Sequence, residues 1–179
     1  DVVSGARGGL RGMASIPMQH PDAATAELER VVREYGFKAV EIGTSIEGAQ
    51  LAEDRFRPVL RRAQELGVFV FAHPYYVGAK SGLECYYLTN LAGNPLDTAV
   101  CIANLMFSGT LDELPDLKML FAHGGGFAPY QIGRLVHGHQ VRPETRARTA
   151  SDPKALLRRL YFDSLLFDPQ ALRDLIDLV

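Results

Sequence analysis

Residues 69–74 read FVFAHP, an apolar run that ends on His73 and is stopped by Pro74. A short, continuous apolar run bounded by proline is typical of a strand buried in a parallel sheet. Residues 118–126 read KMLFAHGGG and follow the same plan, with His123 directly after the apolar run. Two such strands predict an α/β fold in which both histidines lie at strand ends.

Helical segments alternate with the predicted strands. Three more apolar runs bring the number of strands to five, at residues 13–18, 38–44 and 160–165. Apolar residues recur at helical spacing in four segments, from Pro21 to Gly36, from Phe56 to Gly67, from Asn94 to Gly109, and from Ile132 to a stop before Pro143. Asn94 is the expected N-cap of the third helix, and glycine is expected at the C-termini of the first three. This alternation predicts a parallel sheet with crossover helices.

The ends of the strands distinguish an open sheet from a closed barrel. An open, doubly wound sheet gathers its ligand groups at one switch point, often with a glycine-rich phosphate loop after the first strand. A barrel instead places polar groups at the C-terminal ends of many strands. Polar or ionisable residues stand in or directly after every run, namely Gln19, His20, Glu41, His73, His123 and Asp163. We therefore expect a (β/α)8 barrel of the TIM type.

The length and the two ends of the sequence bear on domain organisation. A chain of 179 residues, 47% of them hydrophobic, predicts one domain. The sequence begins at Asp1 and ends at Val179 within an apolar stretch of helical periodicity, with no residue that closes a helix. We interpret residues 1–179 as one partial barrel domain, an internal fragment with about five strand–helix units that lacks the first strands and the last strand.

Charge and cysteine content exclude several classes of partner. Nineteen basic and 21 acidic residues are interspersed and give a net charge of -2, so no basic field is available for nucleic acid or anionic lipid. No segment approaches the roughly 18 apolar residues of a membrane span. Only Cys85 and Cys101 are present, without a disulfide-dense spacing. We expect a cytoplasmic protein that binds neither nucleic acid nor membrane.

His73 and His123 are the candidate catalytic residues. A strand-end histidine can present an imidazole nitrogen to a metal, or it can form a hydrogen bond with a loop carbonyl. The three glycines after His123 have three interpretations: close approach of the backbone to a ligand, anion binding at a helix N-terminus, or a tight turn that needs unusual φ angles. Their spacing matches neither phosphate-loop motif, so a nucleotide is not indicated.

Arg134 and Arg142 are candidates for binding an acidic substrate. They lie on or just after the fourth predicted helix, and the planar guanidinium suits a carboxylate. Surface arginines at a helix C-terminus are nevertheless the commoner explanation. His137 and His139, on the same helix, are two residues apart and point in different directions, which argues against one metal held by both.

Three other groups near strand ends have both a chemical and a structural interpretation. Glu41 is either a second metal ligand or a buried carboxylate paired with arginine. Asp163 is either a proton donor or a helix cap, and His20 is suited to cap the helix that follows it. We favour the structural interpretation for each of the three.

The chain resembles the metal-dependent amidohydrolase superfamily, in particular the branch of aminocarboxymuconate semialdehyde decarboxylase and the γ-resorcylate and carboxyvanillate decarboxylases. The segments that carry the likeness follow in order along the chain, at residues 16–21, 70–74, 93–109, 121–143 and 162–164. The block from residue 121 to residue 143 is long and specific. The resemblance spans essentially the whole chain.

The resemblance implies roles for particular residues. In that family, the histidine at the position of His73 binds a catalytic divalent metal, usually zinc and in some members manganese. The histidine matching His123 is the acid–base residue beside the metal. An arginine matching Arg134 can reach across a dimer interface to hold the substrate carboxylate. Arg142 is a second candidate from the residues alone. By the same likeness we expect a (β/α)8 barrel that forms a homodimer.

The sequence departs from the family pattern at the metal site. The His-x-His pair of the first strand and the metal-binding aspartate of the last strand have no counterpart in these 179 residues. Our leading hypothesis is a metal-dependent carboxy-lyase that acts on a small unsaturated or aromatic carboxylic acid. The alternatives are a metal-dependent hydrolase of an amide, lactone or ester, and a non-catalytic barrel remnant that serves in binding or dimerisation.

Overall fold

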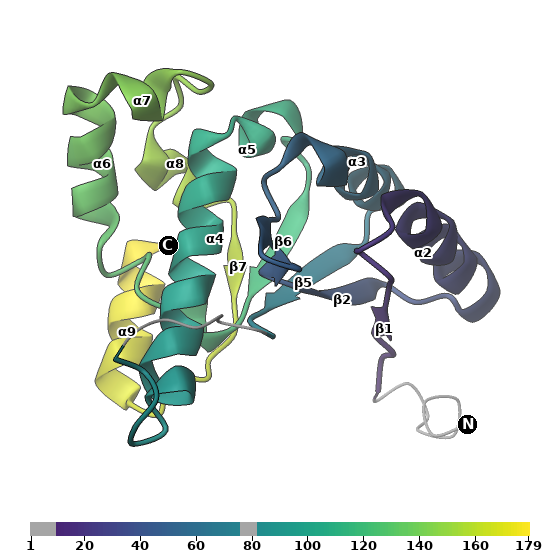
Figure 1. The fold of residues 1–179 in the computed structure, drawn as a ribbon, viewed down its shortest axis with the longest axis horizontal. Helices are drawn as coiled ribbons and strands as arrows, with labels where there is room; N and C mark the ends of the chain where they lie inside the picture. Colours follow the sequence, from purple (N-terminus) through teal and green to yellow (C-terminus); the bar gives the residue numbers. More distant parts are fainter. Residues whose placement is uncertain (1–9, 76–81) are drawn as a thin grey trace.

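Five strands form one parallel sheet in the computed structural model, which describes residues 10–75 and 82–179. The strands are β1 (Ala14–Ser15), β2 (Ala39–Gly43), β5 (Phe69–His73), β6 (Lys118–Phe121) and β7 (Tyr161–Phe162). Their order across the sheet is β1-β2-β5-β6-β7, and every pairing is parallel (Figure 1). Because this order never reverses, the chain winds as it does in a barrel and not as in a doubly wound sheet. The five predicted strands are confirmed, although β1 and β7 are shorter than the apolar runs.

Each strand is followed by helical structure. The longer helices are α2 (Pro21–Tyr35), α3 (Arg57–Leu66), α4 (Asn94–Phe107), α6 (Ile132–Val141) and α9 (Pro169–Leu178), and the shorter ones are α5 (Thr110–Glu113), α7 (Pro143–Arg146) and α8 (Pro153–Leu157). Gly36 and Gly67 end α2 and α3 with φ angles of 66° and 65°, the left-handed caps that the sequence predicts. Within residues 10–75 and 82–179, no helix combines the length and apolarity needed to cross a membrane.

The start of α4 differs from the prediction. Asn94, the expected N-cap, is the first residue of α4 itself, and a π-helical turn over Thr89–Gly93 leads into it. Gly93 holds the cap position with helical backbone angles and no side-chain capping hydrogen bond. The helical path thus begins before Asn94, whereas an N-cap residue needs a non-helical backbone. Pro95 still lies in the first turn, where its missing N–H removes no helical hydrogen bond.

Several short elements lie in the connections after the strands. An antiparallel hairpin of β3 (Ser45–Ile46) and β4 (Ala49–Gln50) follows β2. Short 3-10 turns cover Asp54–Phe56, before α3, and His123–Gly125, after β6. The sequence did not predict these elements, because two or three residues leave no measurable periodicity.

The sheet has one packed face and one open face in the part of the chain that the structure describes. Alternate residues of the central strands are buried in the core beneath the helices, namely Val40, Ile42, Val70, Ala72, Met119 and Phe121. Glu41, Phe71, Leu120 and Tyr161 occupy alternate positions in one register row across the sheet, and all four are partly or fully exposed. In a closed barrel these positions face the interior. The open face therefore corresponds to the inside of a barrel.

Candidate active site

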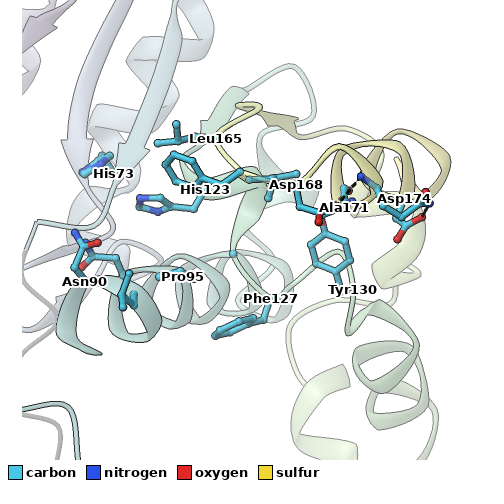
Figure 2. A pocket seen from close by; sticks show the side chains of 16 residues that line it. His73, Asn90, Pro95, His123, Phe127, Tyr130, Leu165, Asp168, Ala171 and Asp174 are labelled. Atoms are coloured by element: carbon cyan, nitrogen blue, oxygen red, sulfur yellow. Dashed lines mark hydrogen bonds between the residues drawn. The ribbon is translucent and has the colours of Figure 1, made fainter. Parts of the chain in front are cut away.

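His73 and His123 meet at the carboxyl edge of the sheet. His73 is the last residue of β5, and His123 follows the end of the neighbouring strand β6 by two residues. Their ring centroids are 5.2 Å apart, and the ring planes are inclined by 51° (Figure 2). Both residues are half-buried. The fold thus brings together the two histidines that the strand-end pattern singles out.

The backbone at His123 has an uncommon conformation. Its φ angle is 57°, and the three glycines that follow have φ angles of 57°, 80° and 62°. A left-handed histidine costs energy and persists only where the surrounding structure imposes it. The turn is closed by two backbone hydrogen bonds, from Gly125 N–H to the Ala122 oxygen (3.0 Å) and from Gly126 N–H to the His123 oxygen (2.8 Å). A strained residue at a strand end is characteristic of a functional site.

Protein atoms fill the space beside these glycines. A Cβ atom on Gly126 would lie 2.0 Å from the carbonyl oxygen of Pro95, and one on Gly125 would lie 2.6 Å from the Phe162 ring. The next long helix, α6, begins only at Ile132, so the turn is not the N-terminus of that helix. These contacts and the positive φ angles support the interpretation of the three glycines as a tight turn. Anion binding at the N-terminus of α6 does not fit this arrangement. Gly126 also lines the pocket beside His123, so close approach of its backbone to a ligand stays a prediction.

Asp163, which directly follows β7, forms a hydrogen bond with the turn that carries His123. Its Oδ1 atom accepts hydrogen bonds from the backbone N–H of Gly124 (2.8 Å) and of Leu165 (3.1 Å). A carboxylate engaged by two backbone donors has a structural function, but the expected helix cap is wrong, because Asp168 and not Asp163 caps α9, the helix that follows. The turn that carries His123 is consequently tied to the chain segment after β7.

Burial and charge both act on His123. Burial lowers the pKa of His123 below its ordinary value and the neighbouring His73 lowers this pKa further, whereas Asp163 raises it. The Nδ1 atom of His123 is buried and has no hydrogen-bond partner among the described residues. A neutral imidazole carries one nitrogen that accepts a proton. The environment of His123 thus favours the form that takes up a proton.

A pocket of about 970 Å³ extends from the two histidines to α9. Figure 2 shows His73 and His123 at one end of this pocket and Tyr130 and Asp174 at the other. Its lining is mostly apolar, as is usual for sites that bind small molecules. The polar lining residues besides the histidines are Asn90, Asn94, Tyr130, Asp168, Gln170 and Asp174. No arginine or lysine lines it among the described residues, so this part of the chain offers no cation to a substrate carboxylate.

Arg134 and Arg142 lie outside this pocket. Both are exposed, Arg134 on α6 and Arg142 directly after it. Arg142 forms a surface ion pair with Glu144 at 3.1 Å. Within one copy of the chain, neither guanidinium lines the pocket of the two histidines, and the substrate-binding role of both stays a prediction.

The other histidines are separate from the site. His139 is buried and its ring stacks on that of Phe107, with 6.1 Å between centroids and 12° between planes. His137 is exposed on the same helix, so the two diverge as expected. His20 holds the N-cap position of α2, but its side chain makes no capping hydrogen bond, and the capping role that we expected for it is wrong.

Glu41 is exposed on the open face of the sheet, which corresponds to the interior of a closed barrel, so both interpretations of this carboxylate stay predictions. It lines a second hollow together with Gln19, Glu47 and His73. The described residues contain no group of three or more histidine, cysteine, aspartate or glutamate side chains arranged to hold a metal. His73 can therefore serve as one ligand of a metal site, but this part of the chain does not complete that site.

The sequence did not identify the residues that line the pocket away from the strand ends. Asn90 and Asn94 are four residues apart on the helical path that leads into α4, and both line the pocket. Tyr130 lies at the far end, where its hydroxyl donates to the Ala171 oxygen at 2.9 Å (Figure 2). These residues lie in loops and helices, where no strand-end pattern marks them. In the sequence, the Asn94-Pro95 pair indicates the start of a helix, and nothing in it indicates that Asn94 lines a pocket.

Comparison with known proteins assigns the family. The family model described as amidohydrolase matches residues 1–179, and the chain belongs to this amidohydrolase family. The 2-amino-3-carboxymuconate-6-semialdehyde decarboxylase of Dictyostelium discoideum is 35% identical over 169 residues, which cover 94% of this chain and 47% of that protein. The chain thus spans about half the length of this relative.

Solved structures share the fold. The 5-carboxyvanillate decarboxylase of Sphingomonas paucimobilis matches with a TM-score of 0.89 and 22% identity, over 99% of this chain and 55% of that one. A dihydroxybenzoic acid decarboxylase from a Polaromonas species, with bound manganese and an inhibitor, matches with a TM-score of 0.85 and 26% identity, over 97% and 56% of the two chains. These likenesses confirm an α/β fold of the TIM-barrel type.

Proposed function

We propose that this chain provides the metal-binding and proton-carrying histidines of a metal-dependent carboxy-lyase, a decarboxylase of a small aromatic or unsaturated carboxylic acid. The observation that carries the proposal is the pairing of His73 and His123 at neighbouring strand ends that line one pocket. The relatives described above are decarboxylases, which supports this reaction class. Residues 1–179 would form part of a single barrel domain.

In this proposal His73 holds a divalent metal, zinc by preference and manganese as the alternative. A half-buried imidazole at the pocket wall fits one ligand position of either ion. When bound, the metal supplies electrophilic stabilisation of the negative charge that develops as CO₂ leaves. The manganese in the Polaromonas relative supports a divalent ion in general. The described residues contain no group of three or more possible metal ligands, so the remaining ligands would come from outside them.

His123 moves the proton that the reaction requires. Loss of CO₂ leaves a carbanion-like carbon that needs one proton. His123, whose lowered pKa favours the neutral form, first takes up a proton from solvent and then donates it as the imidazolium to that carbon. His123 and His73 line the same end of the pocket, so a substrate beside His73 lies beside His123 as well. The half-buried position of His123 limits competition from bulk water.

Arg134, with Arg142 as the second candidate, binds the substrate carboxylate in this proposal. The described lining of the pocket contains no arginine or lysine, and Arg134 is exposed on α6. An exposed arginine is free to enter the pocket of a second copy, so we propose a homodimer in which Arg134 of one protomer completes the site of its partner. We place the protein in the cytoplasm because its cysteine content is low.

The proposal is tested by assaying the intact protein, supplied with zinc or manganese, for CO₂ release from a panel of small aromatic and unsaturated carboxylates. We expect release from at least one acid. Hydrolysis of lactones, esters or amides without CO₂ release from any acid would replace the decarboxylase with a hydrolase. Neither activity, in a protein that also binds no metal, would favour a non-catalytic binding module.

A further inference from the structure

A buried hydrogen bond joins the end of β2 to the first turn of α4. Thr44, the residue after β2, is 1% exposed, and Asp97 in α4 is 7% exposed. The Thr44 hydroxyl donates to Oδ2 of Asp97 at 2.6 Å. A buried carboxylate is costly unless hydrogen bonds satisfy it. The contact is thus a specific link between a sheet edge and a helix.

Thr44 is also linked to the strand that carries the proposed metal ligand. Its backbone N–H donates to the carbonyl oxygen of His73 at 3.3 Å. The preceding residue, Gly43, is the register partner of His73 across the β2–β5 pair. Thr44 therefore holds the backbone of His73 through its amide and the first turn of α4 through its side chain.

The same turn of α4 packs against the backbone that carries His123. The carbonyl oxygen of Pro95 would lie 2.0 Å from a Cβ atom on Gly126, three residues after His123. Pro95 and Asp97 are two residues apart in this turn. The first turn of α4 consequently lies between the two strand ends, with the Thr44–Asp97 bond on the His73 side and the Pro95–Gly126 contact on the His123 side.

We propose that Thr44 and Asp97 are positioning residues that fix His73 relative to His123 by fastening the first turn of α4 to the end of β2. The inference rests on the proposed function, in which His73 binds the metal. Neither residue lines the pocket beside the two histidines, so they act through the backbone of His73 and the placement of α4. Loss of their hydrogen bond is expected to make the position of His73 less well defined and so to weaken metal binding.

The variants Thr44→Val and Thr44→Ser test the bond directly, and Thr98→Val is the matched control. Valine preserves the shape of threonine and removes the hydroxyl, whereas serine retains the hydroxyl. Thr98 is also fully buried in α4, but its hydroxyl donates to the Asn94 oxygen of the same helix at 3.1 Å. Thr98→Val thus removes a buried hydroxyl without cutting the link to His73.

The measurement is Co²⁺ binding to the intact protein, followed by the visible absorption of the bound ion and by competition with a chelator. We expect Thr44→Val to weaken Co²⁺ binding by about 10-fold or more and to change the absorption bands, as supporting residues of metal ligands typically do. Thr44→Ser and Thr98→Val should bind Co²⁺ with the unsubstituted affinity and spectrum. Urea unfolding of all three variants records any general loss of stability.

Three results would overturn the inference. Unchanged Co²⁺ binding by Thr44→Val shows that the bond does not position His73. An equal loss in Thr98→Val shows that the effect is general destabilisation. Failure of the unsubstituted protein to bind Co²⁺ removes the proposed function and this inference together. If Thr44→Val does not fold, Thr44→Ala, which also removes the hydroxyl, replaces it; a weaker Co²⁺ affinity is expected, and an unchanged affinity contradicts the inference.

Discussion

At the scale of single residues, His123 is the most constrained group of the site. It has a left-handed backbone, its turn is fixed by Asp163, and its Nδ1 atom has no partner among the described residues. An apolar run followed by a histidine was enough to predict that His73 and His123 lie at strand ends. The contacts of the glycines could not be predicted, because Pro95 and Phe162 reach them from distant parts of the chain.

His123→Asn tests the proton-carrying role. Asparagine tolerates a positive φ better than most residues, so the turn should be retained, but it cannot transfer a proton as histidine does. We expect CO₂ release to fall by about 100-fold or more while the metal content stays unchanged. Full activity in a variant that still folds would exclude His123 as the proton carrier.

Gly126→Ala tests the packing of the turn. A methyl group at φ 62°, placed 2.0 Å from the Pro95 oxygen, must displace backbone, and we expect a loss of at least about 2 kcal/mol in unfolding free energy. Gly133→Ala in α6 is the control, since a Cβ there meets no atom within 4 Å. It should leave stability unchanged or raise it by up to about 1 kcal/mol. Equal urea midpoints for the two variants would contradict the packing argument.

At the scale of elements, the start of α9 forms the far wall of the pocket and depends on one capping residue. Oδ1 of Asp168 accepts hydrogen bonds from the backbone N–H of Ala171 (2.9 Å) and of Gln170 (2.7 Å). These two bonds lower the pKa of Asp168 below its ordinary value. A lowered folded-state pKa gives stability that is present above the unfolded pKa and is lost as the pH falls through the folded pKa.

Asp168→Ala is therefore expected to lower the urea midpoint at pH 7 and to differ little from the unsubstituted protein at a pH below both pKa values. Asp168→Asn, which retains a capping oxygen, should recover most of the midpoint at pH 7. The measurement is urea unfolding at the two pH values. If Asp168→Ala lowers the urea midpoint by the same amount at both pH values, the charge of the Asp168 carboxylate does not contribute to stability.

The sequence predicted the long elements well and the connections poorly. Periodicity located α2 and α3 together with their glycine caps, since helical spacing and left-handed glycines are local properties. It missed the β3–β4 hairpin and the π-helical turn before α4. That turn places Asn90 in the pocket, and its five residues are too few to show a helical period in the sequence.

At the scale of the whole molecule, the described sheet is an open segment of a barrel. The row of Glu41, Phe71, Leu120 and Tyr161 faces the side that is filled by side chains in a closed barrel. The chain spans about half the length of the relative from Dictyostelium discoideum. The proposed ligand His73 has no group of three or more possible metal ligands around it among the described residues, so in our proposal the other ligands lie elsewhere.

The most direct test of this account is the metal content of the intact protein, measured by mass spectrometry for the unsubstituted protein, His73→Ala and His123→Asn. We expect one divalent metal per chain in the unsubstituted protein, its loss or a strong reduction in His73→Ala, and its retention in His123→Asn. Circular dichroism confirms that each variant is folded. Absence of metal from the unsubstituted protein, or full metal content in His73→Ala, would contradict the account.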